Sequence, residues 1–335
     1  METVSFERTG LKVSRICFGT MGVGSSAWKA WVLDEADSVA LLKRCLDLGI
    51  TFFDMADWYS TGISEEIVGR TLLSMVPREA LVLTTKARYA MSDDPNDAGL
   101  SRKHLLAAMD NSLRRIGTDY VDVFMVHSFD AATPIEETMA TLHDIVKAGK
   151  ARYIGASTMW AWQFAEMNAV ARENGWTSFV NMQCQYNLLY REEEREMIPY
   201  CQDQGIAITT FSPLARGWLS GAADVRAETD QYRARNYGDA LDLKILERVR
   251  AIAEKHGTNM AQVAIAWVLS RKAVCAPIVS VATVGQLESN VDALNLELEP
   301  EELASLEEMY RPRGVVNDYV KDLPRRHLGG LLPGV

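Results

Sequence analysis

The stretch VDVFMVHSFDAATPIEETMATLHDIVKAGKARYIG, residues 121–155, decides the fold. It begins with a β-branched and apolar run at 121–126, continues with an amphipathic segment at 135–148, and ends with a second short run at 152–155. The middle segment follows the helical period, whereas the flanking runs have the length and composition of strands. A strand, a helix and another strand in this order are typical of a βαβ unit in a parallel sheet.

The same unit recurs along the whole chain. Eight runs predict strands: 16–19, 51–54, 81–85, 121–126, 152–155, 180–183, 206–211 and 277–280. Longer amphipathic segments between them predict helices: 35–48, 64–74, 102–116, 135–148, 160–174, 192–204 and 260–270. Glycines, which favour the position just past a helix, end several of these segments: Gly49, Gly117, Gly149, Gly175 and Gly205. Because no Gly-x-Gly-x-x-Gly follows the first strand, the repeat predicts a closed (β/α)8 TIM barrel of α/β class rather than a doubly wound sheet.

Three segments lie outside this repeat. Runs at 4–6 and 12–14 predict an N-terminal hairpin that plugs the barrel, with a frayed terminus as the alternative. Residues 220–238 form a loop insert after the seventh strand, where barrel enzymes often carry a functional loop. Residues 311–335 contain three prolines and no helical period, so we expect an irregular tail. We therefore expect residues 1–335 to form a single barrel domain.

Composition and charge exclude several classes of protein. The 335 residues are 48% hydrophobic and 24% charged, as in ordinary globular proteins. A net charge of −10 without a run of Lys or Arg argues against a nucleic-acid partner. Neither a leader segment nor an uninterrupted apolar run of about 18 residues is present, so we expect a cytoplasmic protein with no membrane contact. Five cysteines without CxxC spacing argue against disulfides and against a metal site.

Ionisable side chains stand at the predicted C-terminal ends of neighbouring strands. Asp54 ends the second strand, and Tyr59 follows in the next loop. Lys86 follows the third strand and His127 follows the fourth. Because the carboxyl ends of barrel strands meet at one rim, where the active sites of such enzymes lie, we expect these four side chains to converge.

The four side chains suggest acid–base chemistry on an oxygen. A phenol with an ordinary pKa near 10 donates a proton at neutral pH only if its anion is stabilised, and Lys86 can supply that charge for Tyr59. Asp54 can keep Lys86 charged and oriented, while His127 can donate a hydrogen bond to a substrate oxygen. The sequence has no nucleophile beside a base and no metal-ligand spacing, so hydride transfer fits better than hydrolysis.

Seven blocks of sequence resemble the aldo-keto reductase superfamily in order and spacing. They are LKVSRICFGTM, FFDMADWYSTGISEEIVGR, LTTK, DYVDVFMVHSFD, KARYIGAS, VNMQCQYNLLYREEE and SPLARGWLSG. The chain looks most similar to the bacterial and fungal branch that acts on sugars, aryl aldehydes and ketones. The resemblance implies an oxidoreductase that reduces a small-molecule aldehyde or ketone to an alcohol with NAD(P)H, with Tyr59 as the general acid.

The resemblance also implies a cofactor site. Ser157 and Gln183 match side chains that hold the nicotinamide amide, and Phe211 matches the ring on which the nicotinamide stacks. The floor beneath the nicotinamide, the pyrophosphate loop and the adenosine end would come from Gly19, Thr20, Asp54, Ser212, Leu214, Arg216, Gly217, Gln286 and Asn290.

Two departures from the family pattern concern the cofactor. Thr158 stands where relatives carry Asn, and it replaces at most part of that amide. Residues 280–283 lack the Arg or Lys that pairs with the 2′-phosphate of NADP. We therefore favour NADP only slightly and expect NAD to be accepted, unless a cation reaches in from elsewhere: Arg226, Arg233, Arg235 or Lys272.

Aromatic residues in several βα loops predict a substrate pocket suited to a sugar face or an aryl ketone. They are Trp28, Trp31, Trp58, Tyr89, Phe129 and Trp160. Simple loop packing is the alternative interpretation.

Two other functions are compatible with the same set of residues. One is a cofactor-binding, redox-sensing partner protein with little turnover. The other is a lyase or isomerase that uses Lys86 as a Schiff-base nucleophile, which Asp54 disfavours because the free amine is the reactive form. The sequence does not specify an oligomeric state.

Overall fold

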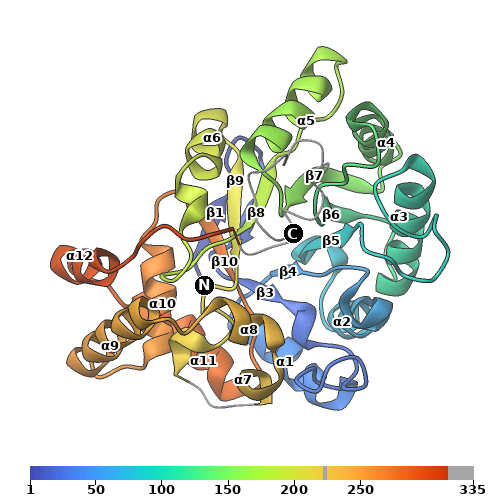
Figure 1. The fold of residues 1–335 in the computed structure, drawn as a ribbon. Coiled ribbons are helices and arrows are strands. Elements are labelled where there is room, and N and C mark those ends of the chain that lie inside the picture. Colours follow the sequence, from blue (N-terminus) through green and yellow to red (C-terminus); the bar gives the residue numbers. More distant parts are fainter. Residues whose placement is uncertain (222–224, 316–335) are drawn as a thin grey trace.

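The strands of the central sheet form a closed barrel. The structure, a computed structural model, describes residues 1–221 and 225–315. In this part of the chain eight parallel strands close in the order β10, β3, β4, β5, β6, β7, β8, β9, and helices surround them (Figure 1). The strands are β3 (Cys17–Gly19), β4 (Phe52–Asp54), β5 (Val82–Ala87), β6 (Val121–Val126), β7 (Ala151–Ser157), β8 (Asn181–Gln185), β9 (Ala207–Phe211) and β10 (Val274–Val279). The predicted (β/α)8 TIM barrel is confirmed.

The last strand differs most from its prediction. β10 begins at Val274, three residues before the predicted start at Pro277. Pro277 lacks an N–H group and normally marks a strand's edge or first residue. Here the register shifts between Val274 and Ala276, just before Pro277, which lies opposite Thr210. Such irregularities allow proline inside a strand, so the strand is longer than its sequence suggests.

Most barrel helices lie within two residues of their predicted bounds. They are α1 (Glu35–Asp47), α2 (Ile63–Leu73), α3 (Arg102–Ile116), α4 (Ile135–Lys147), α5 (Ala161–Glu173), α6 (Met197–Gln204) and α10 (Met260–Leu269). Among these, α6 is shorter than predicted, because only a 3-10 turn (Glu192–Glu194) forms at its expected start. Proline is tolerated only in the first turn of a helix. Because Pro199 lies in the first turn of α6, the helix cannot extend far before Met197. Three further helices were not predicted from the sequence: α9 (Ala240–Lys255), α11 (Val284–Asp292) and α12 (Pro300–Glu308).

The predicted N-terminal hairpin is present. β1 (Thr3–Ser5) pairs antiparallel with β2 (Lys12–Ser14). Phe6 between them is fully buried, and its ring meets that of Phe52 at a centroid distance of 6.0 Å. Phe6 belongs to an apolar cluster with residues near the starts of barrel strands, including Val82 and Ala207. The hairpin therefore closes the N-terminal end of the barrel.

The insert at 220–238 was expected as a loop, and this prediction is wrong for its described part. Two short helices form there, α7 (Val225–Thr229) and α8 (Gln231–Asn236). The Asp230 carboxylate begins α8 by accepting from the backbone N–H groups of Tyr232 and Arg233. Of the predicted tail at 311–335, residues 311–315 have no regular structure and 316–335 lie outside the described residues.

The described residues contain no helix that is long and apolar enough to cross a membrane. Within the same residues, no group of three or more His, Cys, Asp or Glu side chains is placed to hold a metal ion. All five cysteines are buried free thiols.

Candidate active site

The centre of the candidate site is a buried ion pair at the C-terminal end of the barrel. Lys86 Nζ lies 2.7 Å from Asp54 Oδ2, and the two side chains are 0% and 4% exposed. The same ammonium donates to the backbone oxygen of Met55 at 2.8 Å and to the hydroxyl of Tyr59 at 3.2 Å. The three donor protons of Lys86 thus have three oxygen acceptors, which fixes the position of the Tyr59 hydroxyl.

Asp54 is held from a second direction. Its Oδ1 accepts from Gln183 Nε2 at 2.8 Å and from the hydroxyl of Thr84 at 3.2 Å. Gln183 lies on β8, across the barrel from Asp54 on β4. Because the amide nitrogen of Gln183 is engaged, its carbonyl oxygen is the group that can accept a hydrogen bond from a ligand.

Burial and charge set the protonation of this pair. Burial lowers the pKa of Lys86, but Asp54 and Tyr59 outweigh that effect and raise the pKa above its ordinary value. Burial raises the pKa of Tyr59, and the Lys86 charge offsets only part of the rise. Our expectation that Lys86 stabilises the phenolate agrees with the direction of its influence, but the net pKa shift of Tyr59 is upward. Tyr59 is therefore a phenol, able to donate, at neutral pH.

His127 faces the same space. Its ring lies edge-on to the ring of Tyr59, with the centroids 5.8 Å apart. Burial and the charges of Lys86 and Arg88 hold the pKa of His127 well below its ordinary value. The imidazole is therefore neutral over the physiological range, so it can donate a hydrogen bond to a substrate oxygen without acting as the acid.

Left-handed backbone conformations gather in loops that follow the barrel strands. Ser60 and Thr61, directly after Tyr59, have φ of 49° and 51°. Thr158, after β7, has φ of 46°, and Ser212 and Ala215, after β9, have φ of 55° and 47°. Such conformations cost free energy in non-glycine residues and cluster at functional sites. The strain therefore points to the same rim as the ion pair.

The candidate cofactor residues lie in two regions. Ser157 ends β7, and its hydroxyl lies 3.1 Å from that of Thr158. Phe211 ends β9 and is half-buried. Gly19 ends β3, where an added Cβ would lie 2.7 Å from the side chain of Ile278. These residues share the rim with Asp54 and Gln183.

The Thr20 hydroxyl donates to the backbone oxygen of Asp54 at 3.0 Å, which places Thr20 beside the ion pair. Ser212, Leu214, Arg216 and Gly217 form the loop after β9, and Arg216 makes an ion pair of 2.7 Å with Asp230.

The last two cofactor candidates lie farther along the chain. Gln286 and Asn290 are on α11, and in the described part of the chain no hydrogen bond joins either to the central ion pair. The side-chain oxygen of Gln286 accepts from the backbone N–H groups of Ala282 and Thr283, so it closes the first turn of α11. These two residues thus stand on a different element from the nicotinamide candidates.

Three of the six aromatic residues predicted to form the wall lie in a continuous set of rings that ends at His127. Trp28 meets Trp58 at 5.0 Å, Trp58 meets Tyr89 at 5.3 Å, and Tyr89 meets His127 at 4.8 Å between centroids. Trp31 lies beside the set, with the Lys29 ammonium 5.7 Å from its ring.

Phe129 and Trp160 make other contacts. Phe129 faces Trp162 at 6.3 Å between centroids. Trp160 is the N-cap of α5, and its backbone N–H donates to Gln163.

Comparison with known proteins identifies the family. The sequence model of the aldo/keto reductase family matches residues 15–311. The chain belongs to the aldo/keto reductase family. Versiconal hemiacetal acetate reductase of Aspergillus parasiticus is 42% identical over 342 residues, which cover 94% of this chain and 98% of that protein. Aldo-keto reductase AMT2 of Alternaria alternata is 42% identical over 90% of each chain. A provisionally named aryl-alcohol dehydrogenase of Schizosaccharomyces pombe is 39% identical over 91% of this chain and 94% of that protein.

This aldo/keto reductase has a buried carboxyl group behind the ion pair, and this group was not predicted from the sequence. Asp57 is fully buried, and within the described residues neither carboxyl oxygen has a hydrogen-bond partner. The nearby guanidinium of Arg115 is bound instead to Glu65, with Nε 2.7 Å from Oε2. Burial, followed by the charge of Glu65, raises the pKa of Asp57 well above its ordinary value. An acidic residue two positions before Tyr59 was the only signal, and the sequence contains nothing that reveals its burial.

The substitution Asp57→Asn should stabilise the protein increasingly as pH rises. The folded chain keeps a proton on Asp57 that the unfolded chain releases above pH ~3.9, so the stability from this group is complete below that pH and declines up to the folded pKa. The variant has no charged form, so its advantage should grow by about 1.4 kcal/mol per pH unit within this window. Urea unfolding of both proteins at pH 5 and pH 8 measures the difference. The same stability difference at both pH values would show that Asp57 is not protonated on folding.

Proposed function

We propose that this protein reduces an aldehyde or ketone to an alcohol, with hydride from a nicotinamide cofactor and a proton from Tyr59. The observation that carries the proposal is the position of Lys86 Nζ, within hydrogen-bonding distance of both Tyr59 OH and Asp54 Oδ2. Tyr59 donates the proton to the carbonyl oxygen. Lys86 stabilises the phenolate that remains, Asp54 orients Lys86, and neutral His127 donates to the same oxygen as negative charge develops on it.

The residues at the strand ends fit a nicotinamide. The hydroxyls of Ser157 and Thr158 can donate to a carboxamide oxygen, and the carbonyl oxygen of Gln183 can accept from its amide nitrogen. The half-buried ring of Phe211 offers a flat surface for stacking. A bound nicotinamide dinucleotide supplies hydride to the carbonyl carbon. The chain's residues orient the ring, exclude water and deliver the proton at the Tyr59 oxygen.

We infer weak discrimination between NADPH and NADH. Residues 280–283 carry no cation, and α11 begins beside them with Thr283 as its N-cap. Lys272 precedes β10, which spans about 20 Å, so it lies at the opposite end of the barrel. Arg226 pairs with Asp230, the Arg233 guanidinium lies over the ring of Trp218, and Arg235 is in the last turn of α8. Preference for NADPH should therefore stay within about a hundredfold, or under roughly 3 kcal/mol.

The substitution Ala282→Arg should increase the preference for NADPH. Ala282 is exposed, and unlike Thr283 it does not cap α11 with its side chain, so the helix stays intact. A guanidinium there offers a planar donor fork to a 2′-phosphate, worth about 1.5–3 kcal/mol, and NADH affinity should hardly change. Dissociation constants from quenching of protein fluorescence measure both effects, with Ala282→Gln as the neutral control. A wild-type preference of a thousandfold or more would contradict the proposal.

The substrate class we propose is aryl aldehydes and aryl ketones. Sugars are the second substrate class that we propose. The set of rings from Trp28 to His127 supports an aromatic substrate, and the names of two relatives refer to an aryl alcohol and a hemiacetal acetate. A screen of aryl aldehydes, aryl ketones and ketoses with NADPH and NADH tests the function. We further propose that residues 1–335 form one domain that works in the cytoplasm.

A redox-sensing role with little turnover is the second candidate function. It requires the same cofactor site, and the intact set of Asp54, Tyr59, Lys86 and His127 is compatible with it. The substrate screen separates the two functions, because a sensor binds cofactor tightly and reduces almost nothing.

A further inference from the structure

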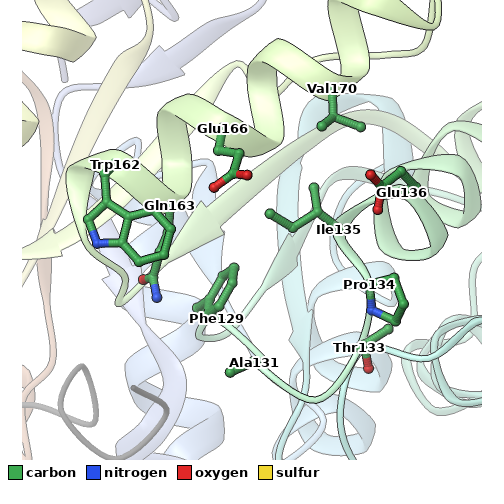
Figure 2. A pocket seen from close by; sticks show the side chains of 10 residues that line it. All are labelled: Phe129, Ala131, Thr133, Pro134, Ile135, Glu136, Trp162, Gln163, Glu166 and Val170. Carbon is green, nitrogen blue, oxygen red and sulfur yellow. The ribbon is translucent and has the colours of Figure 1, made fainter. Parts of the chain in front are cut away.

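A groove of about 310 Å³ lies at the C-terminal rim of the barrel, outside the candidate active site (Figure 2). One wall is the loop between β6 and α4 with the start of α4, and the other is α5. Trp162 on α5 is 53% exposed, although tryptophan is highly buried on average. A large aromatic side chain exposed beside a groove offers apolar area that a ligand can bury. Of the residues that line the groove, only Phe129 belongs to the predicted substrate pocket.

The groove is elongated along α5. Trp162, Glu166 and Val170 are spaced four residues apart, so they share one face of the helix over about 12 Å. Ile135 projects from the opposite wall toward Glu166 (Figure 2). Phe129 lies at one end, 6.3 Å from Trp162 between ring centroids. The groove thus has room for flat apolar groups laid end to end.

The wall formed by the β6–α4 loop is preformed. The backbone N–H of Phe129 donates to Thr158, and its backbone oxygen accepts from Arg88. The next residue, Asp130, accepts from the backbone N–H of Leu100 at 2.9 Å and from the hydroxyl of Thr133 at 2.6 Å. A ligand therefore meets a wall that is already ordered, which lowers the entropic cost of binding.

The groove begins beside the candidate active site. Phe129 follows His127 by two residues, which limits the separation of their backbones to about 7 Å. Trp162 follows the end of β7 by five residues, and Ser157 is the last residue of that strand. The two walls of the groove therefore begin within a few residues of His127 and Ser157.

The charge of the groove restricts its ligand. Glu136 and Glu166 stand on opposite walls, and they are the only charged residues among the described residues that line it. Two carboxylates without a lining cation repel an anionic group. The carboxylates therefore disfavour an anionic group, and the rings of Phe129 and Trp162 favour an aromatic one.

We infer that this groove is a second substrate subsite, which binds the distal, uncharged ring of an extended aryl aldehyde or ketone. The inference rests on the proposed function, because the carbonyl end of the same molecule must lie at Tyr59 and His127. The volume is close to the lower end of small-ligand pockets, of about 300–1,000 Å³. Protein partners need a larger surface, of about 800 Å² on each side.

The test compares benzaldehyde with a benzaldehyde that carries a para-benzyloxy group. Trp162→Ala should raise the KM of the two-ring aldehyde by about tenfold, from the loss of an aromatic contact and its buried area. The KM of benzaldehyde and both kcat values should stay within about twofold, since Trp162 does not reach the carbonyl. Leu243→Ala, which removes another exposed apolar side chain on α9, is the control and should change neither KM.

A second test, of the groove's charge, uses the same two-ring aldehyde with a carboxylate on the distal ring. Glu166→Lys should lower the KM of this anionic substrate severalfold and leave that of benzaldehyde unchanged. The inference is wrong if Trp162→Ala changes both KM values equally or neither, or if it alters the protein's mass in light scattering, which would make the groove an interface between copies. If the wild type reduces benzaldehyde with neither cofactor, the proposed function itself fails.

Discussion

Tyr59→Phe is expected to lower the kcat for carbonyl reduction by about 10²–10⁴-fold, the usual contribution of a positioned general acid. The phenyl ring preserves the packing of Tyr59, including its edge-on contact with His127, and removes only the hydroxyl that Lys86 holds at 3.2 Å. Cofactor binding should therefore be normal. Initial rates with benzaldehyde, together with a fluorescence titration of NADPH, measure both quantities.

A high residual activity would contradict this role of Tyr59. If the Tyr59→Phe variant keeps more than about half of the wild-type kcat, Tyr59 is not the proton donor. A parallel loss of cofactor affinity would instead indicate that the substitution disturbs the site, and His127→Gln would then serve as the comparison for a residue that contacts the same oxygen.

Lys86→Met should reduce kcat to a similar degree. Burial already raises the pKa of Tyr59, and Lys86 supplies the charge that limits the rise. Without that charge the phenolate is more costly, so the pKa of Tyr59 rises further and proton transfer slows. The variant also leaves Asp54 as a buried charge without its partner, which destabilises a fold by about 3–5 kcal/mol.

The double variant Lys86→Met/Asp54→Asn controls for this destabilisation, because it removes both charges together. We expect the free energy of unfolding of the double variant to be closer to that of wild type than the value for Lys86→Met. Its kcat should stay as low as that of Lys86→Met, whereas Asp54→Asn alone should lower kcat less. The measurements are urea unfolding and the pH dependence of kcat/KM. A slow Lys86→Met variant whose pH dependence matches that of wild type would disprove the electrostatic link between Lys86 and Tyr59.

The barrel could be predicted from the sequence because its elements carry local signals. The bounds of β6 (Val121–Val126) and α3 (Arg102–Ile116) agree with the prediction at both ends. β6 is an apolar run interrupted only by Asp122, and α3 lies between the capping residue Ser101 and Gly117 in a left-handed conformation. Once strand ends are known, parallel topology brings their polar residues to one rim, so the proximity of Asp54, Tyr59 and Lys86 followed from the pattern.

Features that depend on tertiary contacts could not be predicted in this way. Asp57 looks like any acidic loop residue in the sequence, and its burial depends on how α2 and α3 pack behind it. The start of β10 depends on an irregular pairing with β9 that Pro277 conceals. The groove beside Trp162 forms between two helices from different repeat units, so no single stretch of sequence contains it. Each of these three features depends on residues that are close in space but not next to one another in the sequence.

The most direct test of the central claim is transfer of deuterium from the cofactor to the substrate. NADPH or NADH labelled with deuterium at the reactive carbon of the nicotinamide is incubated with the protein and benzaldehyde, and the product is analysed by NMR. We predict benzyl alcohol with one deuterium on the carbinol carbon, formed by wild type and nearly absent with Tyr59→Phe. Tight binding of labelled cofactor without any labelled alcohol, across the aldehydes and ketones of the substrate screen, would contradict the account and favour a redox sensor.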